Sequence, residues 1–420
     1  MAVGRVTATT VLAVVVFAPT ALAAPPPTPP APPPPASSDG RILDALLGAR
    51  ADDVPGTQYR EFTTTAAAGR VRGHLIRVDL ANRTVAIRLL RPAVVSAVGT
   101  VPDLAARAGA IGGVNGNFFD QGGTGASVGV ELENGALVKS AVPLGRRPAP
   151  PGPPGSSPDT VLGIGTDGVG RIGRVLFSGT VRLAGREVPL AGLNLYAVPV
   201  GGVAAFTPAW GGATRARTVC GSDTDAKAPC ARDAVEVRVK AGKAVAVGPV
   251  GTTAVPAGEV ALVARDAAAA GMRALRPGDP VDARWTALAP DTPPLRTALG
   301  ALALVRDGAP WPGLQTSERA PRTAVGLSAD GRTLFLIAVD GRQEASVGAT
   351  LAELGRLVTD LGIPQAVALD GGGSTQMVRR PAGGRLGVVN VPSSSPLRAV
   401  ADGLAVVPAG RDFPAGAGTS

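Results

Sequence analysis

The sequence predicts an α/β (α+β) fold with a mixed β-sheet core, and two observations carry this prediction. The C-terminal third contains a strand–helix–strand unit, in which an amphipathic segment at 349–362 joins two apolar runs that end at Asp340 and Asp370. The middle segment, 160–295, is a series of short Val-, Ala- and Leu-rich runs between Gly, Pro and Asp turns. Such a series is typical of β structure.

The chain of 420 residues is expected to fold only in part. Residues 1–23 have the features of a secretory signal peptide, since an arginine precedes an apolar run that ends in Ala-Leu-Ala; an uncleaved anchor helix is the alternative. Residues 24–40 are a proline-rich linker, because proline at this density favours polyproline II over a packed core. One enzyme domain is expected over 41–408, with a Pro/Gly-rich loop at 143–159 and a flexible tail at 409–420.

These segments predict a secreted, extracytoplasmic protein that associates with the cell wall and keeps no stable membrane span after signal cleavage. A formal net charge of +9 favours an anionic partner, either a wall polymer or a sugar phosphodiester. Nucleic acid is not expected, because aromatic residues are scarce and do not alternate with basic runs. Cys220 and Cys230 are expected to form a disulfide in this compartment.

The chain contains one histidine, His74. A zinc site with several histidines is therefore excluded, and a Ser-His-Asp triad has a single candidate base. His74 shares a strand face with Ile76 and Val78, so a core or pocket-wall histidine is the favoured interpretation. Carboxylates are expected to carry any acid–base chemistry.

The first part of the domain is expected to be built from short elements. Residues 71–90 have the pattern of a β-hairpin that turns near Asn82. A short helix is expected at 101–108 and a buried strand at 109–114. A second hairpin is expected to turn at Asn134-Gly135.

The helix at 349–362 is the best-defined element. Five apolar residues share one of its faces, Thr350 and Glu353 fit a capping box, and Gly362 fits a C-terminal stop. A strand, a helix and a strand in this order predict a parallel pair joined by a right-handed crossover. Asp340 and Asp370, which end the two strands, would then share one edge of the sheet, where α/β folds place ligands.

Candidate site residues surround these two carboxylates. Gly371 and Gly372 let the backbone approach an anion and could form a nest of N–H groups, to which Ser374 adds a hydroxyl. Asp-Gly is also a common turn, so either motif alone is weak. Asn115 and Asp120 follow the strand at 109–114 and are further candidates. Arg322, Thr323 and Arg398, which lie at or near later strands, are the others.

The chemistry of these side chains indicates their expected roles. The guanidinium groups of Arg322 and Arg398 are suited to a phosphate. Asp370, Asp340 and Asp120 are the candidate catalytic carboxylates. Asp and Asn clusters could also hold a divalent cation such as Ca²⁺, although no calcium-loop spacing is present and metal dependence stays open.

Together these motifs resemble the secreted phosphodiester glycosidase family, to which the animal uncovering enzyme belongs. The matching segments are GGVNGNFFD, APRTAVGLSADGR, AVDGR, the helix, ALDGGGSTQMV and SPLRAVADGLAV, and the resemblance spans roughly Val71 to Val407. The resemblance implies that the candidate residues above line a pocket. Two departures concern the substrate: Asn117 stands where many relatives have glycine, and Ala301 replaces the second glycine of a usual pair.

The resemblance implies hydrolysis of a glycosyl-1-phosphodiester at the anomeric C–O bond, leaving a phosphate monoester, in envelope polysaccharide or wall glycopolymer. Phosphate is a good leaving group, so a carboxylate base or nucleophile with cations around the phosphate would suffice. Two alternatives stay open: an inactive wall-binding protein, and a metal-dependent phosphodiesterase that cleaves the P–O bond.

Overall fold

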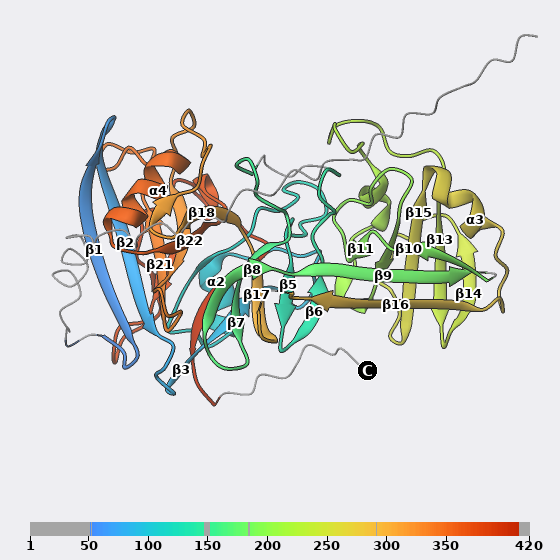
Figure 1. Cartoon of the computed structure of the whole chain (residues 1–420), viewed down its shortest axis with the longest axis horizontal. Helices are drawn as coiled ribbons and strands as arrows, with labels where there is room; N and C mark the ends of the chain where they lie inside the picture. The colour runs from blue at the N-terminus through green and yellow to red at the C-terminus, as the bar shows by residue number, and fades with distance from the viewer. Residues whose placement is uncertain (1–50, 52, 147–151, 184, 291, 411–420) are drawn as a thin grey trace, which may run out of the picture. The chain divides into compact units, whose positions relative to one another are not determined.

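The computed structural model describes residues 51, 53–146, 152–183, 185–290 and 292–410 (Figure 1). The expected signal peptide and linker, the centre of the 143–159 loop and nearly all of the tail lie outside these residues. The chain divides into two units, Met1–Ser37 and Ser38–Ser420, and every described residue belongs to the second. Among the described residues, no helix is long and apolar enough to cross a membrane.

The fold is mixed α/β and rich in strands. A seven-stranded sheet carries the candidate site, and its strand order is β1-β2-β21-β20-β22-β18-β19. Its strands are β1 (Thr57–Ala66), β2 (Gly69–Asp79), β18 (Leu302–Arg306), β19 (Ala309–Pro310), β20 (Arg322–Leu327), β21 (Thr333–Val339) and β22 (Gln365–Ala368).

The predicted strand–helix–strand unit is present, with one addition. Helix α4 (Leu351–Asp360) joins β21 to β22, and its capping box between Thr350 and Glu353 forms as expected. Strand β20 lies between β21 and β22 and is antiparallel to both, so the outer two run parallel without touching. The amino end of β20 therefore meets the carboxyl ends of β21 and β22 at one edge.

Four smaller sheets complete the domain. One is β24-β23-β4-β25-β3, two more have five strands each, and the last is β10-β9-β16. Their strands are β3 (Val85–Leu90), β4 (Gly112–Asn115), β23 (Met377–Arg379), β24 (Gly387–Val388) and β25 (Gly403–Pro408); β5 (Glu131–Glu133), β6 (Ala136–Lys139), β7 (Thr160–Gly165), β8 (Gly170–Arg174) and β17 (Leu295–Gly300); β11 (Gly192–Leu193), β12 (Val203–Phe206), β13 (Ala234–Lys240), β14 (Lys243–Gly248) and β15 (Glu259–Arg265); and β9 (Leu176–Leu183), β10 (Arg186–Pro189) and β16 (Val281–Leu288).

Helices are few and short in the described residues. Besides α4 they are α2 (Val101–Arg107), α3 (Ala269–Arg273) and the 3₁₀ helices η1 (Pro208–Trp210), η2 (Arg215–Val219), η3 (Asp266–Ala268) and η4 (Gly372–Ser374). The helix expected at 101–108 is thus confirmed, as is the β-rich middle segment. Cys220 and Cys230 form the expected disulfide, which fits an oxidising compartment.

One expected hairpin is confirmed and the other is wrong. Strands β5 and β6 pair around Asn134 and Gly135, whose positive φ values of 50° and 79° suit a tight hairpin turn. Strands β2 and β3, expected to pair over 71–90, lie in different sheets: β2 pairs with β1 and β21, and β3 pairs with β25. Strand β2 has a partner on each side, which leaves β3 no edge to join.

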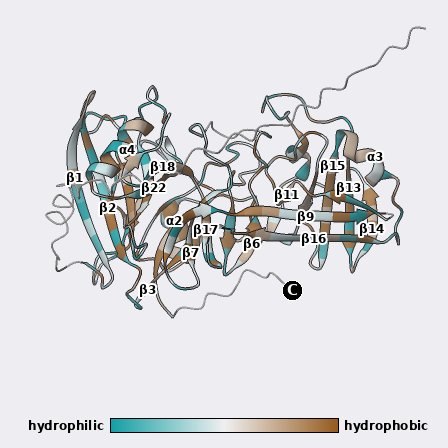
Figure 2. Cartoon of the chain, viewed as in Figure 1, coloured by the Kyte–Doolittle hydropathy of each residue, from teal (hydrophilic) through white to brown (hydrophobic). Residues whose placement is uncertain are grey.

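Each face of the seven-stranded sheet packs against its own core. On one face, Ala324 and Ile337 of the sheet contact Leu354 and Val358 of α4. On the other face, a larger core joins this sheet to β4, β25 and β17. Figure 2 shows the contrast with the edge strand β1, which is largely hydrophilic. The central strands are therefore anchored on both faces, and the site at their ends rests on a rigid support.

Candidate active site

The candidate site lies at the edge where β21 and β22 end and β20 begins. Asp340 follows β21, Asp370 follows β22 and Arg322 begins β20, so the antiparallel insertion of β20 adds a guanidinium between the two carboxylate-bearing strand ends. The parallel direction of β21 and β22 is what brings both aspartates to this edge, as the sequence predicted.

Asn115 links this edge to the neighbouring sheet. Its amide nitrogen donates to the backbone carbonyl of Asp370 at 2.7 Å. Its oxygen accepts from the Thr323 hydroxyl at 2.7 Å and from the Gln376 backbone N–H at 3.2 Å. Asn115 and Thr323 are both fully buried. Both predicted substrate-binding side chains therefore hold the loop after Asp370 in place.

The glycines after Asp370 are required by crowding. A Cβ at Gly371 would lie 2.8 Å from the Pro321 carbonyl oxygen, and Gly372 has a φ of +60°. A Cβ at Gly373 would lie 2.2 Å from the Ser394 hydroxyl and 2.7 Å from the Arg398 guanidinium. Only glycine lets the loop run this close to its neighbours. The N–H groups expected to form an anion nest have partners within the protein: that of Gly371 donates to the Asp370 carboxylate, that of Gly372 to the Pro321 carbonyl and that of Ser374 to the Gly371 carbonyl.

Asp370 is a desolvated carboxylate among cations. Burial raises its pKa to about 6, while hydrogen bonds from the Ser374 hydroxyl and the Gly371 N–H, together with the charges of Arg398 and Arg322, oppose the rise. The Gly371 N–H lies 2.9 Å from the carboxylate oxygen. A carboxyl group with a pKa near neutrality can accept a proton or attack as an anion in ordinary conditions.

Arg322 is held firmly in the site. Its guanidinium donates to the carbonyls of Ala349, at 2.8 Å, and Glu318. Its burial lowers its pKa from the usual range. Arg398 is only half-buried and contacts the Ser374 hydroxyl at 3.5 Å, so its guanidinium is the freer of the two.

Sequence reasoning missed a third guanidinium, that of Arg342. Its side chain lies close enough to the glycine loop that a Cβ at Gly372 would be 3.2 Å from its nitrogen. Glu318 is 3.8 Å away and is its ion-pair partner. Arg342 lies two residues after Asp340 and has a positive φ of 60°, and no local sequence pattern indicates that its side chain reaches the glycine loop.

Asp340 is brought to the same edge, and both of its oxygens have partners. One accepts the Val391 backbone N–H at 2.8 Å, and the other lies 3.0 Å from His74. His74 in turn lies 2.9 Å from the Tyr59 hydroxyl, which contacts Glu61. Asp340 and His74 are both buried, so this chain of contacts joins β1 and β2 to the segment that leads to Arg398.

Asp120 contacts its own loop. Its carboxylate accepts from the Thr124 backbone N–H at 2.7 Å and the Thr124 hydroxyl at 2.9 Å. A Cβ at Gly123 would collide with it. In the described residues no group of three or more His, Cys, Asp and Glu side chains is placed to hold a metal ion.

A comparison with known protein families found a match. Residues 233–407 match the phosphodiester glycosidase family. The matched segment runs from β13 to β25. It contains Arg322, Asp340, Asp370 and Arg398, whereas Asn115 and Asp120 precede it. The resemblance noted from the motifs is thereby confirmed, and the match supports phosphodiester glycosidase activity in general.

Solved structures share the fold at low sequence identity. A hypothetical protein from Synechocystis matches 86% of this chain with a TM-score of 0.65 and 18% identity; the chain spans 65% of that protein. A putative exported protein from Burkholderia pseudomallei matches 81% of this chain, and 74% of that one, with a TM-score of 0.61 and 24% identity.

The zebrafish N-acetylglucosamine-1-phosphodiester alpha-N-acetylglucosaminidase catalytic domain, auto-inhibited by its pro-peptide, matches at a TM-score of 0.45 and 15% identity, over 86% of each chain. No curated protein sequence matches the chain.

Proposed function

We propose that the chain is an exported hydrolase that cleaves a glycosyl-1-phosphodiester at the sugar's anomeric C–O bond, in envelope polysaccharide or a wall glycopolymer. The observation that carries this proposal is Asp370: a half-buried carboxylate with a pKa of about 6, next to a glycine loop and the guanidinium groups of Arg322, Arg342 and Arg398. Anion-binding groups and a carboxylate of tuned basicity are what this reaction needs.

In the proposed reaction, water supplies a hydroxyl to the anomeric carbon. The bond from that carbon to the bridging oxygen breaks, and its electron pair stays on the phosphate, which leaves as a monoester. Asp370 acts either as the base that takes the proton from water or as the nucleophile that water later displaces. Arg398, the freer guanidinium, holds the phosphate by a charge-assisted contact.

Hydrolysis in ¹⁸O-labelled water tests this assignment on a panel of sugar-1-phosphodiesters. We expect the label in the sugar product, because the anomeric carbon is attacked. Label in the phosphate would instead show P–O cleavage by a phosphodiesterase. Absence of turnover on the whole panel would indicate a wall-binding protein without activity.

The export part of the proposal has its own test. The disulfide fits an oxidising compartment, and the first residues have a signal-peptide pattern. We expect the intact mass of protein recovered outside the cell to correspond to a start near Ala24. A recovered mass that includes residues 1–23 would contradict cleavage.

A further inference from the structure

Three guanidinium groups, those of Arg322, Arg342 and Arg398, lie against the three consecutive glycines that follow Asp370. A Cβ added at these glycines would be, in chain order, 3.5, 3.2 and 2.7 Å from the three groups. Positive charge is therefore concentrated on the loop that carries Asp370. An anion that reaches this carboxylate has to pass the three cations.

The three cations differ in the contacts that they already make. Two nitrogens of Arg322 donate to backbone carbonyls, and the third, Nη1, is the one that lies against Gly371. Arg398 makes a long contact of 3.5 Å to the Ser374 hydroxyl. Arg342 has a side chain that is 47% exposed, and its ion-pair partner is a carboxylate. Each cation therefore keeps donors for a bound anion.

The carboxylate of Glu318 lies between two of these cations. One of its oxygens is 3.8 Å from an Arg342 nitrogen, and the other is 3.9 Å from an Arg322 nitrogen. Both distances exceed a hydrogen bond, and the side chain is 61% exposed. Glu318 is therefore a loosely held internal anion, which contacts two of the cations that an external anion would use.

Glu318 and Asp370 act on the same guanidinium. Burial lowers the pKa of Arg322, and the negative charge of Glu318 is the largest effect that opposes this change; Asp370 opposes it too, and Arg342 adds to it. Asp340, another carboxylate at this edge, is buried, and both of its oxygens have partners. Glu318 is therefore an exposed negative charge that an anion entering the site would meet.

We infer that Glu318 is a specificity-determining residue, which makes the site favour a phosphodiester, with one negative charge, over a phosphate monoester, with two. The repulsion between Glu318 and a bound anion is proportional to the charge of that anion, so a dianion is opposed twice as strongly as a monoanion. The inference rests on the proposed function for the position of the phosphate. It also implies that Glu318 promotes release of the product, because hydrolysis of the diester creates the monoester.

Binding of two simple phosphates tests the inference without turnover. The probes are glycerol 1-phosphate and glycerophosphoglycerol, a monoester and a diester without an anomeric carbon, titrated at pH 8 and followed by ³¹P NMR. The monoester is a dianion at this pH, since its second pKa is about 6. Glu318→Gln should tighten diester binding by about threefold and monoester binding by about tenfold, because the change in log affinity follows ligand charge. The backbone carbonyl of Glu318, which Arg322 uses, is kept.

Glu187→Gln is the matched control, because it makes the same change in charge at an exposed position of β10, in a different sheet. It should leave both affinities unchanged. Weaker binding of both probes by Glu318→Gln would show that Glu318 only braces the arginines, and this result would overturn the inference. Unchanged affinities, equal tightening of the two probes, or the same response in the control would overturn it as well.

The inference and the proposed function can fail separately. A preferential gain of monoester affinity in Glu318→Gln, in a protein that hydrolyses no sugar phosphodiester, would support the role of Glu318 and remove the proposed function. Hydrolysis with ¹⁸O label in the sugar, without the preferential gain, would keep the proposed function and remove the role of Glu318.

Discussion

The pKa of Asp370 is set by opposing effects of its surroundings. Burial favours its neutral form, and the neighbouring hydrogen bonds and guanidinium groups favour its charged form, with burial the larger effect. The outcome is a pKa of about 6, above the usual value of about 4 for an aspartate. The same surroundings therefore give this carboxyl its raised pKa and make its ionised form unfavourable for folding.

Asp370→Asn is expected to abolish turnover and to raise stability at neutral pH. The pKa of Asp370 is higher in the folded chain than in the unfolded chain, so ionisation of this carboxyl lowers the free energy of unfolding. The loss of stability is complete above about pH 6 and absent below about pH 4. The variant should therefore gain melting temperature over the unmodified chain at pH 7.5 and not at pH 4. The kcat/KM of the unmodified chain should fall below about pH 6 as Asp370 takes up a proton.

Asp330→Asn is the control for this pair of measurements. Asp330 also precedes a glycine in a turn, but it is exposed, and the Ser328 hydroxyl lowers its pKa, so its replacement should not stabilise the chain. Full activity in a folded Asp370→Asn variant would remove Asp370 from the mechanism.

Arg398→Lys tests the phosphate contact. The substitution keeps the charge and loses the planar fork, so kcat/KM on phosphodiesters should fall about tenfold or more, whereas slow turnover of a neutral glycoside of the same sugar should not change in parallel. Arg385→Lys, at an exposed position, is the matched control and should change neither. Equal losses on both substrates would show that Arg398 only braces its loop.

Arg322→Lys should also lower stability, because two backbone carbonyls would lose their donors.

Asp340 connects β2 to the segment that leads to Arg398, so its replacement should lower stability. Asp340→Ala removes the partners of the Val391 N–H and of buried His74, and each buried group left unpaired costs about 1–3 kcal/mol. We expect a lower free energy of unfolding in urea and a higher KM, since the segment before Arg398 loses its anchor. Asp340→Asn keeps an acceptor for Val391 and should be milder. Unchanged stability with kcat lost in both variants would indicate a catalytic carboxylate instead.

Elements that depend on nearby residues were predictable from sequence, and pairings between distant ones were not. The capping box of α4 spans Thr350 to Glu353, so the local pattern was enough. The partner of β3 is β25, more than three hundred residues later, and no local pattern at 71–90 could show it. The same reason explains why β20 was not expected between β21 and β22.

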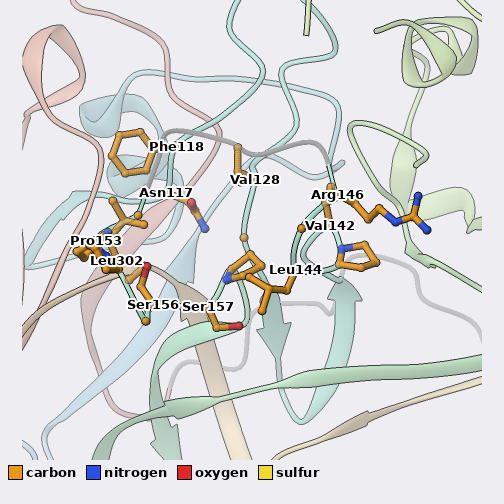
Figure 3. Close-up of a pocket in the computed structure, with 18 residues that line it drawn as sticks. Asn117, Phe118, Val128, Val142, Leu144, Arg146, Pro153, Ser156, Ser157 and Leu302 are labelled. Atoms are coloured by element: carbon orange, nitrogen blue, oxygen red, sulfur yellow. The ribbon is translucent and has the colours of Figure 1, made fainter. Parts of the chain in front are cut away.

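The candidate site was predicted only in part, for the same reason. Asp370 and its glycines are consecutive in sequence, and they lie at the sheet edge as predicted. Arg342 was missed because only the folded chain brings its guanidinium next to Gly372. A cavity of about 290 Å³, lined by residues that include Asn117, Leu144 and Leu302 (Figure 3), was not foreseen because its lining comes from separate segments of the chain. The two departures from the family pattern, Asn117 and Ala301, both line this cavity.

At the scale of the whole molecule, the disulfide is expected to act on stability and not on chemistry. Cys220 and Cys230 close a short loop in the middle segment, far in sequence from Asp370. Replacing both by serine should lower the free energy of unfolding by about 2–3 kcal/mol, because the unfolded chain gains freedom. The kcat of the folded variant at low temperature should be unchanged, and a fall in kcat without a fall in stability would contradict this separation.

The hydrogen bond from Asn115 to the Asp370 carbonyl has a consequence for folding, because 255 residues separate its two ends. Contacts of such separation form late, after the entropy of closing the intervening chain has been overcome. During refolding, far-UV circular dichroism should thus recover before catalytic activity does. A nascent chain would have no assembled site until its last strands had been made, so the protein would be inactive until synthesis was nearly complete.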